Sequence, residues 1–237
     1  MKSFEDYIIE YPNVIGSDLC NDIITKFDSD DRKYQGRSSA GVFLDVKDSI
    51  DLPISALEDW DDIDGQIYES TTKYFSDYIK DYLSWTNNNP PCILNDCGYQ
   101  IQKTTPGGQY IWHHDALLSP LIGTDYVTNA GFNKQWVRER IFTFILYLND
   151  RIDGQDSENG RTQFYNSGIS KSVVPEKGKL LLFPANTFWT HRGEPLTTGV
   201  KYLLTGWCSG YFATEPSTPS SDDMNAIKGF TEQQSKL

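Results

Sequence analysis

From about residue 95 onward, the chain consists of short apolar or alternating segments separated by Gly, Pro, Asn and Asp. Segments of this kind are typical of β-strands bounded by turns. No helix-length periodic segment lies between them, which favours an antiparallel sandwich or barrel of the jelly-roll kind over a parallel sheet. We expect strands over residues 99–103, 110–114, 140–148, 162–165, 179–183, 188–192 and 200–207.

The first part of the chain has a helical pattern instead. Residues 62–83 predict the strongest helix, because apolar and aromatic side chains recur along one stripe. Such a stripe is more often a packing surface than a cofactor site. A shorter helix is expected to begin with Ser17 as its cap and to end at the polar cluster 28–31. The fold class predicted is therefore mainly β, with N-terminal helices that buttress a jelly roll.

A length of 237 residues suits one well-buried domain better than two. We expect a single domain over residues 1–213, in which 1–95 form the helical buttress and early strands and 96–213 form the jelly-roll core. Residues 214–237 are rich in Ser, Thr, Pro and Asp, which is typical of a flexible tail. An insertion at 118–135 is long enough to be a lid or a binding loop.

Charge and cysteine content limit the partners and the compartment. The net charge of −12 would repel a phosphate backbone, so no nucleic-acid partner is expected. No apolar run is long enough to span a membrane. The first residues lack the pattern of a signal peptide, and the four cysteines do not form a disulfide scaffold. These features predict a cytoplasmic protein with free thiols, and they leave the oligomeric state open.

The chain contains three histidines, His113, His114 and His191. Because side chains alternate along a strand, His113 and Asp115 should share one face while His114 points to the other. His191, on a later strand, can complete a set of two histidines and one carboxylate. That set leaves open positions on iron(II), as in non-haem oxygenases, whereas zinc prefers a closed site. An H-x-D pattern alone is more often coincidence, so the surrounding sequence has to support it.

The surrounding sequence provides that support, because four segments between about residues 97 and 208 resemble, in order, the core of a known family. This family is the iron(II)- and 2-oxoglutarate-dependent dioxygenases, in their prolyl-4-hydroxylase-like branch. The segments are YQIQKTTPGGQYIWHHDA with H-x-D, RIFTFILYLND, ENGRTQFY with Gly-x-Thr-x-Phe, and GKLLLFPANTFWTHRGEPLTTGVKYLLTGW with the distal histidine. The resemblance implies a double-stranded β-helix with His113, Asp115 and His191 as metal ligands and catalytic centre.

The resemblance also implies the cofactors, which are Fe(II), 2-oxoglutarate as co-substrate and dioxygen, with ascorbate as a further candidate. Lys201 stands ten residues after the distal histidine, where the family has the basic residue that binds the far carboxylate of 2-oxoglutarate. The alternative is a surface lysine with its stem on the sheet. Thr143 and Tyr147 share a strand face and match positions that hydrogen-bond the co-substrate, although Tyr147 could equally be a packing residue.

One position departs from the family pattern. A tyrosine often stands nine residues before the first histidine, and here that position is Thr104. Tyr110 or Gln102 could replace its hydrogen bond, and we count Tyr110 among the expected co-substrate residues. Trp207 fits an aromatic position near the end of the barrel and is expected to belong to the core.

The chemistry implied is hydroxylation of a C–H bond coupled to the conversion of 2-oxoglutarate into succinate and carbon dioxide. A prolyl residue of a peptide or protein is the first expected substrate, and a free amino acid or other small metabolite is the second. Nucleic-acid demethylases of the family usually carry two arginines after the distal histidine, whereas here Arg192 is followed by Lys201. A non-catalytic jelly-roll binding module is less expected, because the triad and Lys201 are all present.

Overall fold

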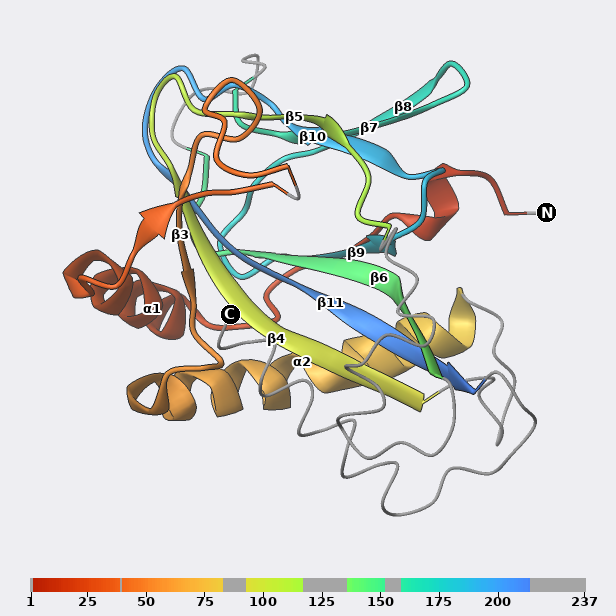
Figure 1. The fold of residues 1–237 in the computed structure, drawn as a ribbon, viewed down its shortest axis with the longest axis horizontal. Coiled ribbons are helices and arrows are strands. Elements are labelled where there is room, and N and C mark those ends of the chain that lie inside the picture. The colour runs from red at the N-terminus through yellow and green to blue at the C-terminus, as the bar shows by residue number, and fades with distance from the viewer. Residues whose placement is uncertain (1, 39, 83–92, 117–135, 152–158, 214–237) are drawn as a thin grey trace.

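The computed structural model describes residues 2–38, 40–82, 93–116, 136–151 and 159–213 (Figure 1). The insertion expected at 118–135 and the tail expected at 214–237 lie outside these residues. In chain order the elements are η1 (Glu5–Tyr7), β1 (Ile9–Tyr11), α1 (Ser17–Ser29), β2 (Tyr34–Gln35), β3 (Ile50–Pro53), η2 (Glu58–Trp60), α2 (Asp61–Asp81), β4 (Ile93–Thr104), β5 (Tyr110–His113), β6 (Trp136–Tyr147), β7 (Thr162–Asn166), β8 (Ile169–Val173), β9 (Leu180–Pro184), β10 (Thr190–Gly193) and β11 (Lys201–Ala213).

The strands form two antiparallel sheets that face each other. The large sheet has seven strands in the order β1-β9-β6-β11-β4-β3-β2, and the small sheet has four in the order β5-β10-β7-β8. Figure 1 shows the small sheet above the large one, with the two helices below. This arrangement confirms the predicted mainly-β jelly roll with N-terminal helices.

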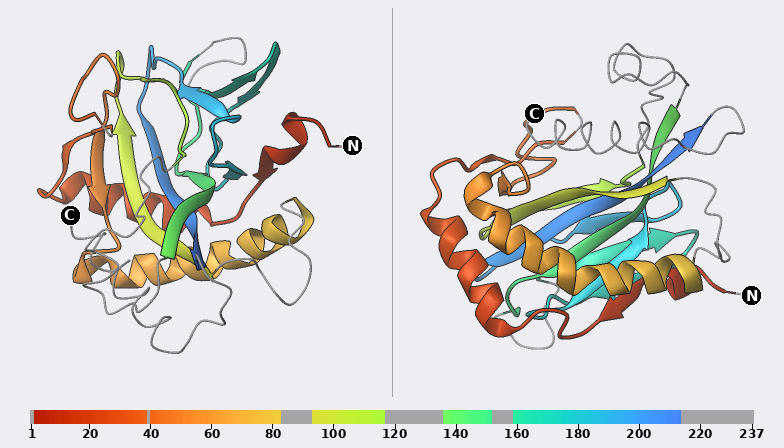
Figure 2. Two further views of the ribbon diagram at one scale, coloured as in Figure 1. Left: turned by 45° about the vertical axis from the view of Figure 1, so that its right-hand side comes forward. Right: turned by 90° about the horizontal axis from the view of Figure 1, so that it is seen from below.

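Helices α1 and α2 cover the outer face of the large sheet (Figure 2). Strand β6 shows how the faces divide. Its residues Phe142 and Phe144 pack on Phe75 of α2, with ring centroids 5.4 and 4.9 Å apart. Ile145 and Tyr147 of the same strand face the small sheet instead, so this part of β6 is buried on both sides and its sequence is a nearly continuous apolar run. None of the described helices is long and apolar enough to cross a bilayer.

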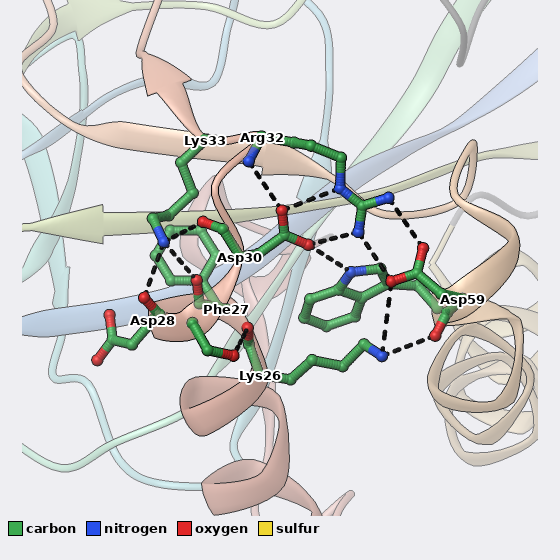
Figure 3. Close-up of polar contacts among 9 residues, drawn as sticks. Lys26, Phe27, Asp28, Asp30, Arg32, Lys33 and Asp59 are labelled. Carbon is green, nitrogen blue, oxygen red and sulfur yellow. Dashed lines mark hydrogen bonds and ion pairs between the residues drawn. The ribbon is translucent and has the colours of Figure 1, made fainter.

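The end of α1 is fixed by a cluster of charged side chains (Figure 3). The ammonium of Lys33 donates to three main-chain carbonyls at the helix C-terminus, those of Phe27, Asp28 and Asp30. It thus satisfies acceptors that a helix end leaves open. Arg32 bridges Asp30 and Asp59, and Asp30 also accepts from the indole of Trp60. These bonds connect α1 to η2 and so position α2.

Several sequence expectations need correction. The predicted cap Ser17 is already the first residue of α1, and the capping position is Gly16, with no side-chain bond. Strand β8 was not predicted. The early strands expected within residues 1–95, whose positions the sequence did not locate, include β1, β2 and β3, which extend the large sheet on both sides. The strand expected at 188–192 begins only at Thr190. The core strands and the long helix lie where the sequence predicts them, apart from shifts at their ends.

Candidate active site

The three predicted metal ligands come together between the sheets. His113 ends β5, Asp115 follows it by two residues, and His191 lies on β10 directly opposite His113 in the register. Their ligand atoms all lie within 4.8 Å of one another. The Nε2 atom of His191 is 3.5 Å from Oδ2 of Asp115, and Nε2 of His113 is 3.8 Å from Oδ1 of the same carboxylate. His114 is not part of this group.

Hydrogen bonds around the ligands prepare them for a metal. Nδ1 of His113 lies 2.8 Å from the carbonyl of Ile111, and Nδ1 of His191 lies 3.0 Å from that of Trp189. A proton on each Nδ1 leaves the Nε2 lone pair directed at the metal position. Burial, together with the neighbouring His191, lowers the pKa of His113 to about 3 and so favours the neutral imidazole that metal binding needs. This donor set fits Fe(II).

Thr143 on β6 contacts a metal ligand directly. Its hydroxyl donates to Oδ2 of Asp115 over 2.7 Å, and both groups are buried. A hydroxyl held in this way fixes the carboxylate orientation. We expected Thr143 to bond the co-substrate. The structure places it in the cavity wall, with its hydrogen bond directed to the expected metal ligand Asp115.

A β-bulge in β5 brings Tyr110 into the site. Tyr110 pairs with Gly193 and His113 pairs with His191, so β5 has one residue more than β10 between these pairs. Tyr110 and His113 therefore face the same cavity, although strict alternation would place them on opposite faces. Their rings stack with centroids 3.6 Å apart. Tyr110 thus lies against the metal site, as a result of a feature that the residue pattern does not reveal.

The cavity beside the ligands is lined by most of the residues expected to bind the co-substrate. Lys201, Thr143 and Tyr110 form part of its wall, and so does Thr162 of β7. Tyr147 is not among the lining residues. Its hydroxyl lies 2.6 Å from the hydroxyl of Thr162 and is buried behind it. Tyr147 can therefore influence the cavity by orienting Thr162.

Lys201 brings a positive charge to the inside of the barrel. It is 7% exposed, and its ammonium donates to the carbonyl of Gly160 over 3.0 Å. Burial lowers the pKa of Lys201 to about 8, although nearby Glu194 raises it. Glu194 is itself held by two guanidinium bonds from Arg161, each 2.8 Å long. No carboxylate in the described part of the chain forms an ion pair with Lys201, so a ligand carboxylate would be a suitable partner.

Two further donors near the metal were missed as site residues. The guanidinium of Arg140 lies 3.6 Å above the ring centroid of Trp207, and its Nη1 atom donates to the carbonyl of Asp115. Nε of Arg140 and Nε1 of Trp207 are buried without any hydrogen-bond partner among the described residues. Buried donors normally have acceptors, so these two indicate a place for a ligand oxygen. The available signal was an arginine directly before the apolar run 141–147.

Comparison with known proteins agrees with this geometry. Residues 99–209 match the 2OG-Fe(II) oxygenase superfamily. This match runs from β4 to β11 and includes all three expected metal ligands. The chain is 33% identical over 92 residues to the Xenopus tropicalis 2-oxoglutarate and iron-dependent oxygenase domain-containing protein 3, a match that covers 39% of this chain and 25% of that protein. The chain thus spans about a quarter of the length of this curated relative.

Solved structures show the same fold at low sequence identity. A prolyl-4-hydroxylase of Pseudomonas putida superposes with a TM-score of 0.60 at 15% identity, over 85% of this chain and 91% of that one. A Trichoplax adhaerens prolyl hydroxylase in complex with a hypoxia inducible factor oxygen degradation domain peptide fragment gives 0.56 at 17%, over 87% and 83%. The viral collagen prolyl hydroxylase of Paramecium Bursaria Chlorella virus-1 gives 0.55 at 15%, over 86% and 96%. The superfamily match and the His-Asp-His triad together imply Fe(II) and 2-oxoglutarate as cofactors.

Proposed function

We propose that this oxygenase hydroxylates a prolyl residue of a peptide or protein, and that it does so in the cytoplasm. The observation that carries the substrate proposal is a pair of buried donors, Nε of Arg140 and Nε1 of Trp207, that have no acceptor among the described residues and lie near the expected metal ligands. A peptide-bonded proline has no N–H and offers carbonyl oxygens, so it matches these two donors. The aromatic faces of Trp207 and Tyr110 suit its apolar ring.

A free amino acid is the second candidate substrate. Its carboxylate would pair with the guanidinium of Arg140, whereas its ammonium group would be repelled there, so it would fit in one orientation only. In a peptide that nitrogen is part of an amide and carries no charge. The relatives of similar fold whose names mention prolyl hydroxylation support the proposal as analogies of fold only.

The residues of the site have distinct proposed roles. His113, Asp115 and His191 would hold Fe(II), which with 2-oxoglutarate and dioxygen supplies the oxidising power to convert a C–H bond into an alcohol. Lys201 binds the distal carboxylate of the co-substrate, next to the hydroxyl of Thr162, which Tyr147 orients. Thr143 fixes the carboxylate of Asp115. The walls between the two sheets keep water away from the reacting carbon.

The proposed role of Lys201 predicts how co-substrate affinity depends on pH. With its pKa at about 8 in the free protein, Lys201 is charged below pH 8 and loses its proton above it. Because 2-oxoglutarate needs the charged form, its Kd should stay constant below pH 8 and rise up to about tenfold per pH unit above it. Titration of 2-oxoglutarate between pH 6.5 and 9.5 with Mn(II) at saturation measures this. Lys201→Arg, which stays charged, should give a flat profile, and a flat wild-type profile would contradict the role.

The substrate proposal is tested by succinate release with capped peptides. A blocked peptide with a central proline should stimulate release and gain the mass of one oxygen atom on that proline, whereas its Pro→Ala counterpart should not. Arg140→Gln should weaken peptide use without changing the Kd of 2-oxoglutarate. Stimulation by free amino acids with no response to any peptide would replace this proposal with the small-metabolite alternative.

A further inference from the structure

A second lysine lines the cavity, and the roles proposed above do not use it. Lys47 is 4% exposed and forms an ion pair with Asp51 of β3, with Nζ and Oδ2 2.6 Å apart. Asp51 is 1% exposed. Lys47 and Ser49 are part of the same cavity wall as His113 and Lys201. The pair therefore lies at the candidate active site rather than in a separate part of the core.

The backbone fixes Lys47 in this position. Residues 46–48 run along the outer edge of β5, since the amide of Ile111 donates to the carbonyl of Val46 and the amide of Asp48 donates to that of Gln109. Lys47 lies directly opposite Tyr110 in an antiparallel bridge. Opposite residues of such a pair point to the same face, and Nζ of Lys47 is 5.5 Å from the Tyr110 ring centroid.

The two members of this ion pair differ in how many of their hydrogen bonds are formed. Asp51 accepts three, from Lys47, from Gln100 over 2.9 Å and from Ser49 over 2.8 Å, so its carboxylate is well satisfied. An ammonium has three donors. Within the described residues, Lys47 donates one hydrogen bond, to Asp51. Its other two N–H groups can therefore donate to a molecule in the cavity.

The charges decide what kind of molecule fits. The positive charge of Lys47 is cancelled by Asp51, so a ligand carboxylate would gain little there, whereas a neutral carbonyl oxygen needs only the free N–H groups. Lys201 differs, because no carboxylate among the described residues forms an ion pair with it, so it suits an anion. Trp207 lines the cavity from β11, with Arg140 of β6 stacked on its ring, while Asp51 lies on β3, two strands away from β11 in the large sheet. The cavity thus has N–H donors on two sides, and both sets suit an uncharged oxygen acceptor such as a carbonyl.

We propose that Lys47 donates a hydrogen bond to a main-chain carbonyl oxygen of the substrate, on the side of the reacting residue away from Arg140 and Trp207. This inference rests on the proposed function and narrows it. A residue recognised through carbonyls on both sides lies inside a peptide chain, with an amide before it and an amide after it. Lys47 is then a specificity residue for internal peptide positions.

The test uses the double variant Lys47→Met/Asp51→Asn, which removes the ammonium without leaving a buried charge unpaired. The KM for a capped prolyl peptide should rise at least about tenfold, the effect expected for a hydrogen bond worth about 1.4 kcal/mol. The Kd of 2-oxoglutarate and substrate-free succinate release should stay within about twofold. Lys47→Gln keeps N–H donors and should retain most of the peptide affinity. Lys103→Met removes a lysine paired with Asp28 on the outside of the barrel and serves as the matched control.

Peptide truncation gives a second readout. Wild type should lose affinity when the carbonyl on one side of proline is removed without adding a charge, as in a cyclopentanecarboxamide or an acyl pyrrolidine. One of these two compounds lacks the carbonyl that Lys47 binds. The double variant should bind that compound as well as it binds the capped prolyl peptide. A wild-type KM in the double variant, or a raised Kd for 2-oxoglutarate, would overturn the role of Lys47 alone. If wild type hydroxylates no prolyl peptide, the proposed function fails and this inference fails with it.

Discussion

Alanine at His113, Asp115 or His191 should abolish iron-dependent turnover of 2-oxoglutarate, while His114→Ala should retain it. Each of the three residues offers one ligand atom to a common position, and loss of one leaves a set that no longer holds the metal. Changes to outer-shell partners of metal ligands typically cost about 10–100-fold in affinity, so loss of a ligand should cost more than about 100-fold.

Metal titration and succinate release, measured on the same protein samples, check this prediction. His114 is the matched control, since it is adjacent to His113 in sequence and outside the ligand group. Thermal unfolding of each metal-free variant shows that the fold survives. Iron affinity that persists in His113→Ala and collapses in His114→Ala would show that the ligand assignment is wrong.

Lys201→Ala should raise the KM for 2-oxoglutarate by at least about 100-fold with little change in iron affinity. The ammonium is buried, and loss of one partner of a buried charge pair typically costs about 3–5 kcal/mol, with each 1.4 kcal/mol worth about tenfold. Lys201→Arg should be tolerated only in part, because a planar guanidinium differs in reach and geometry from an ammonium.

Titration of 2-oxoglutarate at saturating iron compares these variants. Lys179→Ala is a suitable control, because Lys179 is also largely buried but pairs with Glu10 and Glu176 away from the cavity. Equal constants for wild type, Lys201→Ala and Lys201→Arg would mean that another cation, such as Arg140 or Arg192, binds the carboxylate.

The residues with a strong local pattern could be predicted from the sequence. H-x-D on a strand and a lysine ten residues after the distal histidine have fixed spacings, and the structure brings His113, Asp115, His191 and Lys201 to one cavity. The two-sided burial of β6 also follows from its apolar run. These features depend on neighbours in sequence or on a regular strand, which side-chain patterns describe well.

Other parts of the site depend on pairing between distant segments. The bulge that turns Tyr110 toward His113 is a matter of register between β5 and β10, and alternation alone predicts the opposite face. Lys47 reaches the cavity because residues 46–48 pair with the edge of β5, although they lack a strand pattern. The bond between Thr143 and Asp115 joins residues that are remote in sequence, so no spacing rule could have indicated it.

Strand β1 has a consequence for the behaviour of the chain in solution. It covers the outer side of β9, with Ile9 opposite Leu182, and all five residues of β9, Leu180–Pro184, are buried. Proteolytic removal of the first eleven residues would free a row of main-chain donors and acceptors on an apolar edge. Such an edge is a template for pairing with another molecule. These N-terminal residues therefore protect the protein against aggregation, although they lie outside the catalytic cavity.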